Sequence, residues 1–186
     1  MAPQPLTPDR IVAEALALLQ ESGLEAVSLR RLAARLGVQA MSIYWHIANK
    51  DELLRQMSQK VFQDSMSTMP ECQSWQDWAR VYGLGLWDMY HRVRDAARLT
   101  FSVRYSDDDF RQIGDSLAAY LTRFGLDAGQ AIQLHSSIQA LVIGWAGFDH
   151  TFGEPLGRLI EIEPAMGDSL DALIKGWDLK LAMGEV

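Results

Sequence analysis

The chain has little cysteine, few prolines and no long hydrophobic run. Its single cysteine, Cys72, excludes an internal disulfide framework and a zinc site built from several thiolates. No stretch approaches the roughly 18 consecutive apolar residues of a membrane-spanning helix. The first six residues lack the basic and apolar regions of a signal peptide. We therefore expect a cytoplasmic protein that has no membrane partner.

Basic residues are also scarce. The 186 residues include 17 Lys and Arg against 24 Asp and Glu, which gives a net charge of −7. Such a balance is unfavourable for binding nucleic acid. However, residues 28–50 contain no acidic side chain and four basic ones, Arg30, Arg31, Arg35 and Lys50. Because charges are screened over about 10 Å, phosphate binding depends on this local potential and not on the average.

The alternation of apolar and polar residues that is typical of strands is absent, and apolar residues recur at helical spacing along nearly the whole chain. We expect an all-α fold of about nine helices. A break at 69–73 divides it into an N-terminal domain over 1–67 and a second domain over 68–186. Residues 153–164, which contain glycines and prolines, are predicted to form a loop.

The segment 29–46 predicts two short helices that meet at a glycine. Gly37 is expected to adopt a positive φ and reverse the chain, and Val38 and Ile43 are expected to be buried between the helices. The outer face of the second helix has small, amide, hydroxyl and aromatic groups in place of Lys and Glu. Such a face suits base edges, thymine methyl groups and the sugar-phosphate backbone.

A different interpretation of this segment remains open. Any helical protein can contain a corner of two helices, and Tyr44 and Trp45 would then belong to the core. The basic flank without acidic residues favours DNA binding over this alternative.

Residues 7–65 resemble the DNA-binding domain of the TetR family of transcriptional regulators. The specific elements are Tyr44-Trp45-His46 and Asn49-Lys50, set in a matching apolar spacing. Ser74-Trp75-Gln76-Asp77 and Arg94-Asp95-Ala96-Ala97 are similar, more weakly, to the tetracycline-repressor subgroup. The resemblance implies an Ω-shaped, all-helical homodimer, a repressor that binds palindromic operator DNA and releases it when a ligand binds.

The resemblance also implies roles for single residues. The base-facing positions are Arg30, Gln39, Ala40, Met41, Ser42 and Tyr44, and the positions that contact or orient the DNA backbone are Ser28, Trp45, His46 and Lys50. The tetracycline-repressor subgroup has Gln-Pro where this chain has Ala40-Met41, so a different operator is expected. Its positions for magnesium and tetracycline hold other groups here, notably Thr100, so neither a metal nor another cofactor is expected.

Aromatic residues are dense in the second half of the chain. For any single residue, core packing is the simpler explanation. As a set, they could line a pocket for a flat hydrophobic effector, with histidine and amide groups giving a few polar contacts. The candidates are Trp78, Tyr82, Trp87, Phe101, Tyr105, His135, Gln139 and Trp145.

Helices expected at 127–152 and 166–182 are candidates for the homodimer interface. The first carries Gly144, Ala146 and Gly147 beside its apolar stripe, and small residues allow helices to approach closely. Two copies of each helix would form an intermolecular four-helix bundle. The alternative is that the 127–152 helix is a core helix of a single chain.

Catalytic motifs are missing from the sequence. No Gly-x-Ser-x-Gly, Walker or Gly-x-Gly-x-x-Gly pattern occurs, and no pair of histidines shares a helix face. The acidic run after Ser106 is predicted to be the start of a helix. A non-catalytic regulator is therefore favoured over a helical ligand-binding module without DNA function, and over an enzyme on a helical scaffold.

Overall fold

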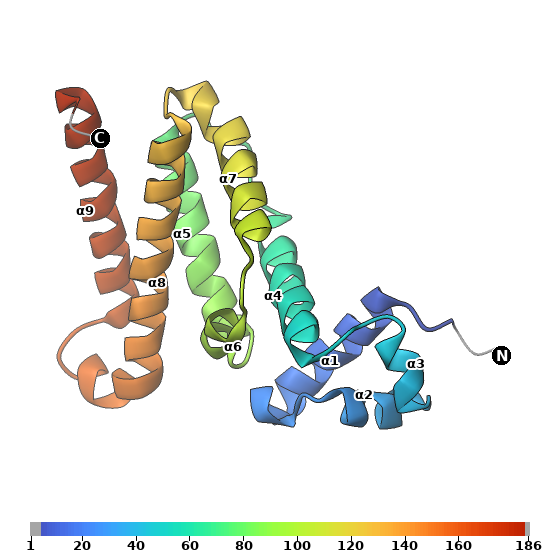
Figure 1. The fold of residues 1–186 in the computed structure, drawn as a ribbon. Helices are drawn as coiled ribbons and strands as arrows, with labels where there is room; N and C mark the ends of the chain where they lie inside the picture. The colour runs from blue at the N-terminus through green and yellow to red at the C-terminus, as the bar shows by residue number, and fades with distance from the viewer. Residues whose placement is uncertain (1–4, 185–186) are drawn as a thin grey trace. The chain divides into compact units, whose positions relative to one another are not determined.

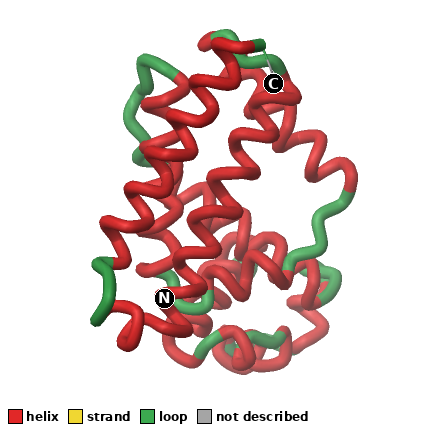
Figure 2. Tube along the Cα trace, turned by 90° about the vertical axis from the view of Figure 1, so that its left-hand side faces the viewer, coloured by secondary structure: helices red, strands yellow, loops and turns green. Residues whose placement is uncertain are grey.

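The structure is a computed structural model that describes residues 5–184. Within this range the chain forms nine α-helices, two 3-10 helices and no strand (Figures 1 and 2), which confirms the all-α prediction. The α-helices are α1 (Pro8–Ser22), α2 (Leu29–Leu36), α3 (Ala40–Tyr44), α4 (Lys50–Met66), α5 (Trp75–Arg92), α6 (Ala96–Ser102), α7 (Asp107–Leu121), α8 (Ala128–Gly157) and α9 (Ile162–Met183). None of the described helices combines the length and the apolar character needed to cross a membrane.

The helices form two compact units, and each unit is built from two stretches of chain. The first unit contains the residues up to Asp64 and the returning segment His91–Arg104, and the second contains Ser65–Tyr90 and the residues from Tyr105 onward. The sequence predicts a single division at residue 67. It does not predict that residues 91–104 belong to the first unit.

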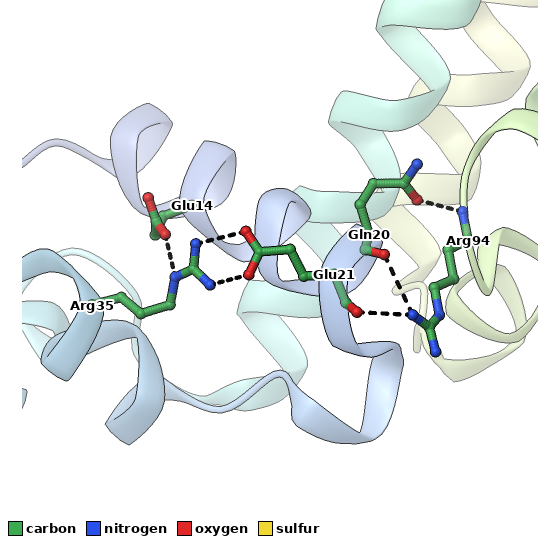
Figure 3. Close-up of polar contacts among 5 residues, drawn as sticks. All are labelled: Glu14, Gln20, Glu21, Arg35 and Arg94. Atoms are coloured by element: carbon green, nitrogen blue, oxygen red, sulfur yellow. Dashed lines mark hydrogen bonds and ion pairs between the residues drawn. The ribbon is translucent and has the colours of Figure 1, made fainter.

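Polar contacts explain why the returning segment belongs to the first unit. Asp95 accepts a hydrogen bond from the Leu24 backbone N–H at 2.8 Å. Arg94 donates from its backbone to the side chain of Gln20 at 2.6 Å, and its guanidinium donates to the backbone carbonyls of Gln20 and Glu21 at the end of α1 (Figure 3). These contacts satisfy carbonyl groups that the end of a helix leaves without partners.

The core of the first unit forms where α1 packs against α2, and α2 against α3. Thr7 caps α1 by accepting a hydrogen bond from the Arg10 N–H, and Gly23 ends this helix with a φ of 79°. The side chains of Ile11, Leu19 and Leu32 are completely buried. Their spacing on α1 and α2 is the helical pattern found in the sequence.

In the second unit, α8 packs along both α7 and α9. Gly83 shows how closely α5 approaches α8 and α9. A Cβ at this position would lie 2.6 Å from Leu170 Cδ2 and 3.3 Å from Ile138 Cγ2. Both of these side chains are buried, so a Cβ at residue 83 would displace the Leu170 side chain from its place in the core.

The predicted loop over 153–164 is wrong for most of its length. The α8 helix continues to Gly157, and α9 already begins at Ile162. Pro155 is the third residue from the end of α8, so the hydrogen bond that it cannot donate is lost only in the last turns of this long helix. Pro164 lies in the first turn of α9, where an N–H has no partner within the helix.

Candidate nucleic-acid interface

The turn between α2 and α3 has the geometry expected from the sequence. Ser28 begins α2 by accepting a hydrogen bond from the Arg31 N–H at 3.3 Å. Gly37 ends the helix in the left-handed region, with φ 66° and ψ 30°. The Gly37 N–H donates to the Ala34 carbonyl at 3.3 Å, and the Val38 N–H donates to the Ala33 carbonyl at 3.0 Å. The predicted left-handed turn is confirmed.

Small and branched side chains hold α3 against α2. Ala33 is buried, which allows the helices to approach, and Ile43 is completely buried. Ile47, just after α3, is also completely buried. Val38 was expected to be buried with Ile43, but it is only half-buried because it lies in the turn itself, before α3 begins.

The opposite face of α3 is exposed. The exposed fractions are 66% for Met41, 50% for Tyr44 and 84% for Trp45. Gln39, Ala40 and His46 are exposed as well, and Ser42 is half-buried. The alternative that Tyr44 and Trp45 belong to the core is therefore wrong. The proposed base-facing and backbone-facing residues lie at or beside one outward surface of the first unit.

Arg35 differs from the other basic residues of this segment. Its guanidinium forms a two-pronged ion pair with Glu21, with Nη2 at 2.9 Å from Oε1, and its Nε donates to Glu14 (Figure 3). Hydrogen bonds to the two carboxylates raise the pKa of Arg35, and the hydrogen bond from Arg35 lowers the pKa of Glu21. The ion pairs of Arg35 thus connect α2 to α1.

The cationic surface is therefore smaller than the sequence indicates. Arg30, Arg31 and Lys50 are exposed, and none of them forms an ion pair with another residue in the described range. The expected four charges become three that are available to phosphates. Glu14 and Glu21 are seven residues apart and so share one helix face, but their spacing alone does not show that this face meets Arg35.

Three of the candidate effector residues form one stack in the second unit, in which Trp78 and Tyr82 are buried and His135 is half-buried. The rings of Trp78 and Tyr82 lie 5.0 Å apart and almost parallel, and the rings of Tyr82 and His135 lie 5.1 Å apart. The Tyr82 hydroxyl is 2.7 Å from His135 Nε2, within hydrogen-bond distance. Three residues that the sequence offers separately as effector candidates thus lie together where α5 contacts α8.

This stack carries no charge near neutral pH. Burial lowers the pKa of His135 to about 4, so the imidazole is neutral. Burial also raises the pKa of the Tyr82 hydroxyl, and the nearby Tyr90 and Tyr105 act in the same direction. The pair therefore offers neutral hydrogen-bonding groups in apolar surroundings.

The other effector candidates are distributed differently. Trp87 is buried, and Tyr105, Gln139 and Trp145 are half-buried. Phe101 is 76% exposed and belongs to the first unit, so it is not part of the stack. An open hollow of about 210 Å³ lies elsewhere in the second unit, lined by Pro70, Glu71, Cys72, Gln73, Asp77, Arg80 and Val81.

The described residues contain no group of three or more His, Cys, Asp or Glu side chains arranged to hold a metal ion. Thr100, at the position where the resemblance would require a metal ligand, donates its hydroxyl to the Ala96 carbonyl at 3.0 Å. This contact lies within α6 and occupies the Thr100 hydroxyl as a donor.

A short helix that presents polar and apolar groups outward, after a tight turn and beside unpaired cations, defines a helix–turn–helix protein. Residues 11–57 match the model of the tetR family of bacterial regulatory proteins. Over these residues the chain is similar to regulators of the TetR family.

Curated relatives extend this similarity beyond the first unit. The tetracycline repressor protein class A from transposon 1721 of Escherichia coli is 28% identical over 144 residues, which cover 75% of this chain and 65% of that protein. The matched part thus spans slightly less than two thirds of this relative's length. The repressor DrrR1 of Streptomyces coeruleorubidus is 45% identical over 60 residues, which are 32% of this chain and 22% of that protein.

Solved structures share the fold over nearly the whole chain. ActR of Streptomyces coelicolor without ligand is 26% identical with a TM-score of 0.73, and the match covers 95% of this chain and 96% of that one. A TetR from Acinetobacter baumannii in complex with minocycline has a TM-score of 0.77 at 24% identity, covering 94% and 97%.

Proposed function

We propose that the protein is a cytoplasmic transcriptional repressor that binds palindromic operator DNA as a homodimer and is released from it by a small hydrophobic effector. The observation that carries this proposal is the outward face of α3, with its large exposed side chains and three unpaired cations nearby. The TetR family consists of regulators and not of enzymes, so we assign no catalytic role.

DNA contacts are divided between two sets of residues in this proposal. Arg30 and the outward residues of α3 meet base edges in the major groove. Ser28, Trp45, His46 and Lys50 meet the sugar-phosphate backbone and set the register. Arg31, which is exposed and unpaired, adds a further phosphate contact at the start of α2.

Dimerisation is proposed through α8 and α9. These helices pack side by side, yet each keeps an exposed apolar edge. On α8 this edge contains Phe148 and Phe152, and on α9 it contains Leu179 and Met183. No atom lies within 4 Å of a Cβ built at Gly144 or Gly176, so both helices have room for the helices of a second copy.

Lys50 and Arg35 provide a matched test of the DNA interface. We expect Lys50→Ala to weaken binding to all duplexes about equally, and to reduce the slope of log K against log salt by about 0.9 for each protomer. Arg35→Gln removes the same charge, but we expect it to leave the slope unchanged because Arg35 is paired with Glu14 and Glu21. Fluorescence anisotropy at several salt concentrations measures both slopes.

Two results would contradict this assignment. Equal losses of slope in the two variants would mean that Arg35 binds phosphate. An unchanged slope for Lys50→Ala would mean that Lys50, at the start of α4, makes no phosphate contact.

The effector is proposed to bind in the second unit beside Trp78, Tyr82 and His135. Among the solved structures with a similar fold, TetR of class A is in complex with 5a,6-anhydrotetracycline and magnesium, and ActR is in complex with actinorhodin. For this chain we propose recognition without a metal. A neutral Tyr–His pair amid aromatic rings favours an apolar molecule with one or two hydrogen-bonding groups.

Operator release in the presence of a chelator tests this proposal. Actinorhodin and anhydrotetracycline serve as probes, each with EDTA and with added magnesium. We expect any probe that releases the operator to do so equally well in EDTA, because apolar burial supplies the binding energy. Release that requires magnesium would contradict a metal-free site.

A further inference from the structure

The outward face of α3 has no group that can distinguish guanine through a charged contact. No Lys, Arg, Asp or Glu occurs between residues 36 and 49. Guanine is most often read by the two-pronged contact of an arginine or lysine, and cytosine by a carboxylate. In this segment such a contact can come only from Arg30, which lies on α2.

The groups that α3 does present are suited to A·T pairs. Ala40 and Met41 are consecutive, exposed and apolar, and Met41 is the longest side chain in the first turn of the helix. The major-groove edge of thymine carries the only methyl group among the four bases. A thioether chain that is two thirds exposed gains most from the major groove by covering that methyl group.

Gln39 adds an independent indication of the same base pair. It is the N-cap residue of α3, but its side chain makes no capping hydrogen bond. Its amide forms no hydrogen bond with another residue in the part of the chain that the structure describes, so the amide is available to a ligand. A glutamine amide matches the paired donor and acceptor of adenine N6 and N7.

We infer that α3 recognises adjacent A·T pairs, with Met41 packed against a thymine 5-methyl group and Gln39 bonded to adenine. This inference rests on the proposed function, because it specifies what the proposed DNA interface reads. The inference predicts that Met41 contacts one thymine methyl group. This methyl group can be removed from the DNA without any change in base pairing.

The test uses a duplex selected by the full-length protein from random-sequence DNA. Each thymine of the selected site is replaced in turn by deoxyuridine, which lacks only the methyl group. We expect one position in each half-site at which wild-type affinity falls about fourfold, the effect of burying one methyl-sized group. For Met41→Ala, the same replacement should have little further effect, because the side chain that covers the methyl group is absent.

The control variant is Lys50→Ala, which should bind both duplexes more weakly and keep the wild-type ratio between thymine and deoxyuridine. Met41 is exposed, so Met41→Ala should preserve the melting temperature. If no deoxyuridine replacement weakens the wild type, or if the loss persists in Met41→Ala, the inference is overturned while specific DNA binding stands. If selection enriches no sequence, the inference and the proposed function both fail.

Discussion

Phe148→Glu is expected to convert the protein from a dimer into a monomer and to lower its operator affinity by about 1,000-fold or more, toward the level of non-specific binding. Phe148 is 56% exposed in the single chain and forms an edge-to-face contact with Phe152 at 5.9 Å. An interface along α8 and α9 would bury it. A glutamate would then place an uncompensated charge in each copy, at a cost of about 3–5 kcal/mol per site. A monomer would hold only one half-site.

A matched control for this variant is Phe110→Glu on α7. Phe110 is similarly exposed, at 62%, but it lies outside the edge formed by α8 and α9. The Phe110→Glu variant should therefore remain dimeric and bind the operator normally. Sedimentation at micromolar concentration distinguishes a 20.9 kDa monomer from a dimer. A monomeric wild type, or a dimeric Phe148→Glu with normal affinity, would remove the interface from α8 and α9.

Gly37→Val is expected to abolish specific operator binding and to destabilise the first unit. Gly37 has a φ of 66°, and a branched side chain in this region costs roughly 1–2 kcal/mol. A Cβ at this position would meet no atom within 4 Å, so the cost comes from the backbone and not from a clash. To relieve the strain the turn would have to open, which would move α3 away from its orientation on α2.

Gly37→Asn serves as the control, because asparagine tolerates the left-handed region better than other residues that have a Cβ. We expect Gly37→Asn to retain most of the operator affinity. Thermal unfolding and anisotropy titrations should rank the proteins as wild type, Asn and Val. If Gly37→Val melted and bound like the wild type, the turn would not be required for recognition.

The local parts of the DNA-binding surface could be predicted from the sequence because their signals are local. A serine one residue before α2, a glycine after it and a buried isoleucine on α3 determine the turn through contacts over a few residues. The orientation of α3 also follows, since burying Ile43 directs Met41 and Trp45 outward.

Contacts between distant residues could not be predicted in this way. The pairing of Arg35 with Glu14 and Glu21 depends on the angle between two helices, and composition alone counts Arg35 as a free cation. Aromatic content likewise did not separate Phe101, which is exposed, from Trp78 and Tyr82, which are buried. The end of α8 differs from the prediction because Pro155 removes one hydrogen bond without ending a helix that is 30 residues long.

The division of the first unit between two stretches of chain affects how the protein is made. Ribosomes add residues one after another from the N-terminus, and domains generally fold as units during this process. The Leu24 N–H can receive its partner only after Asp95 has been synthesised, and by then α4 and the whole of α5 have already been synthesised. The DNA-binding unit therefore cannot be completed from its first 64 residues, and its maturation is delayed until the chain has passed Arg104.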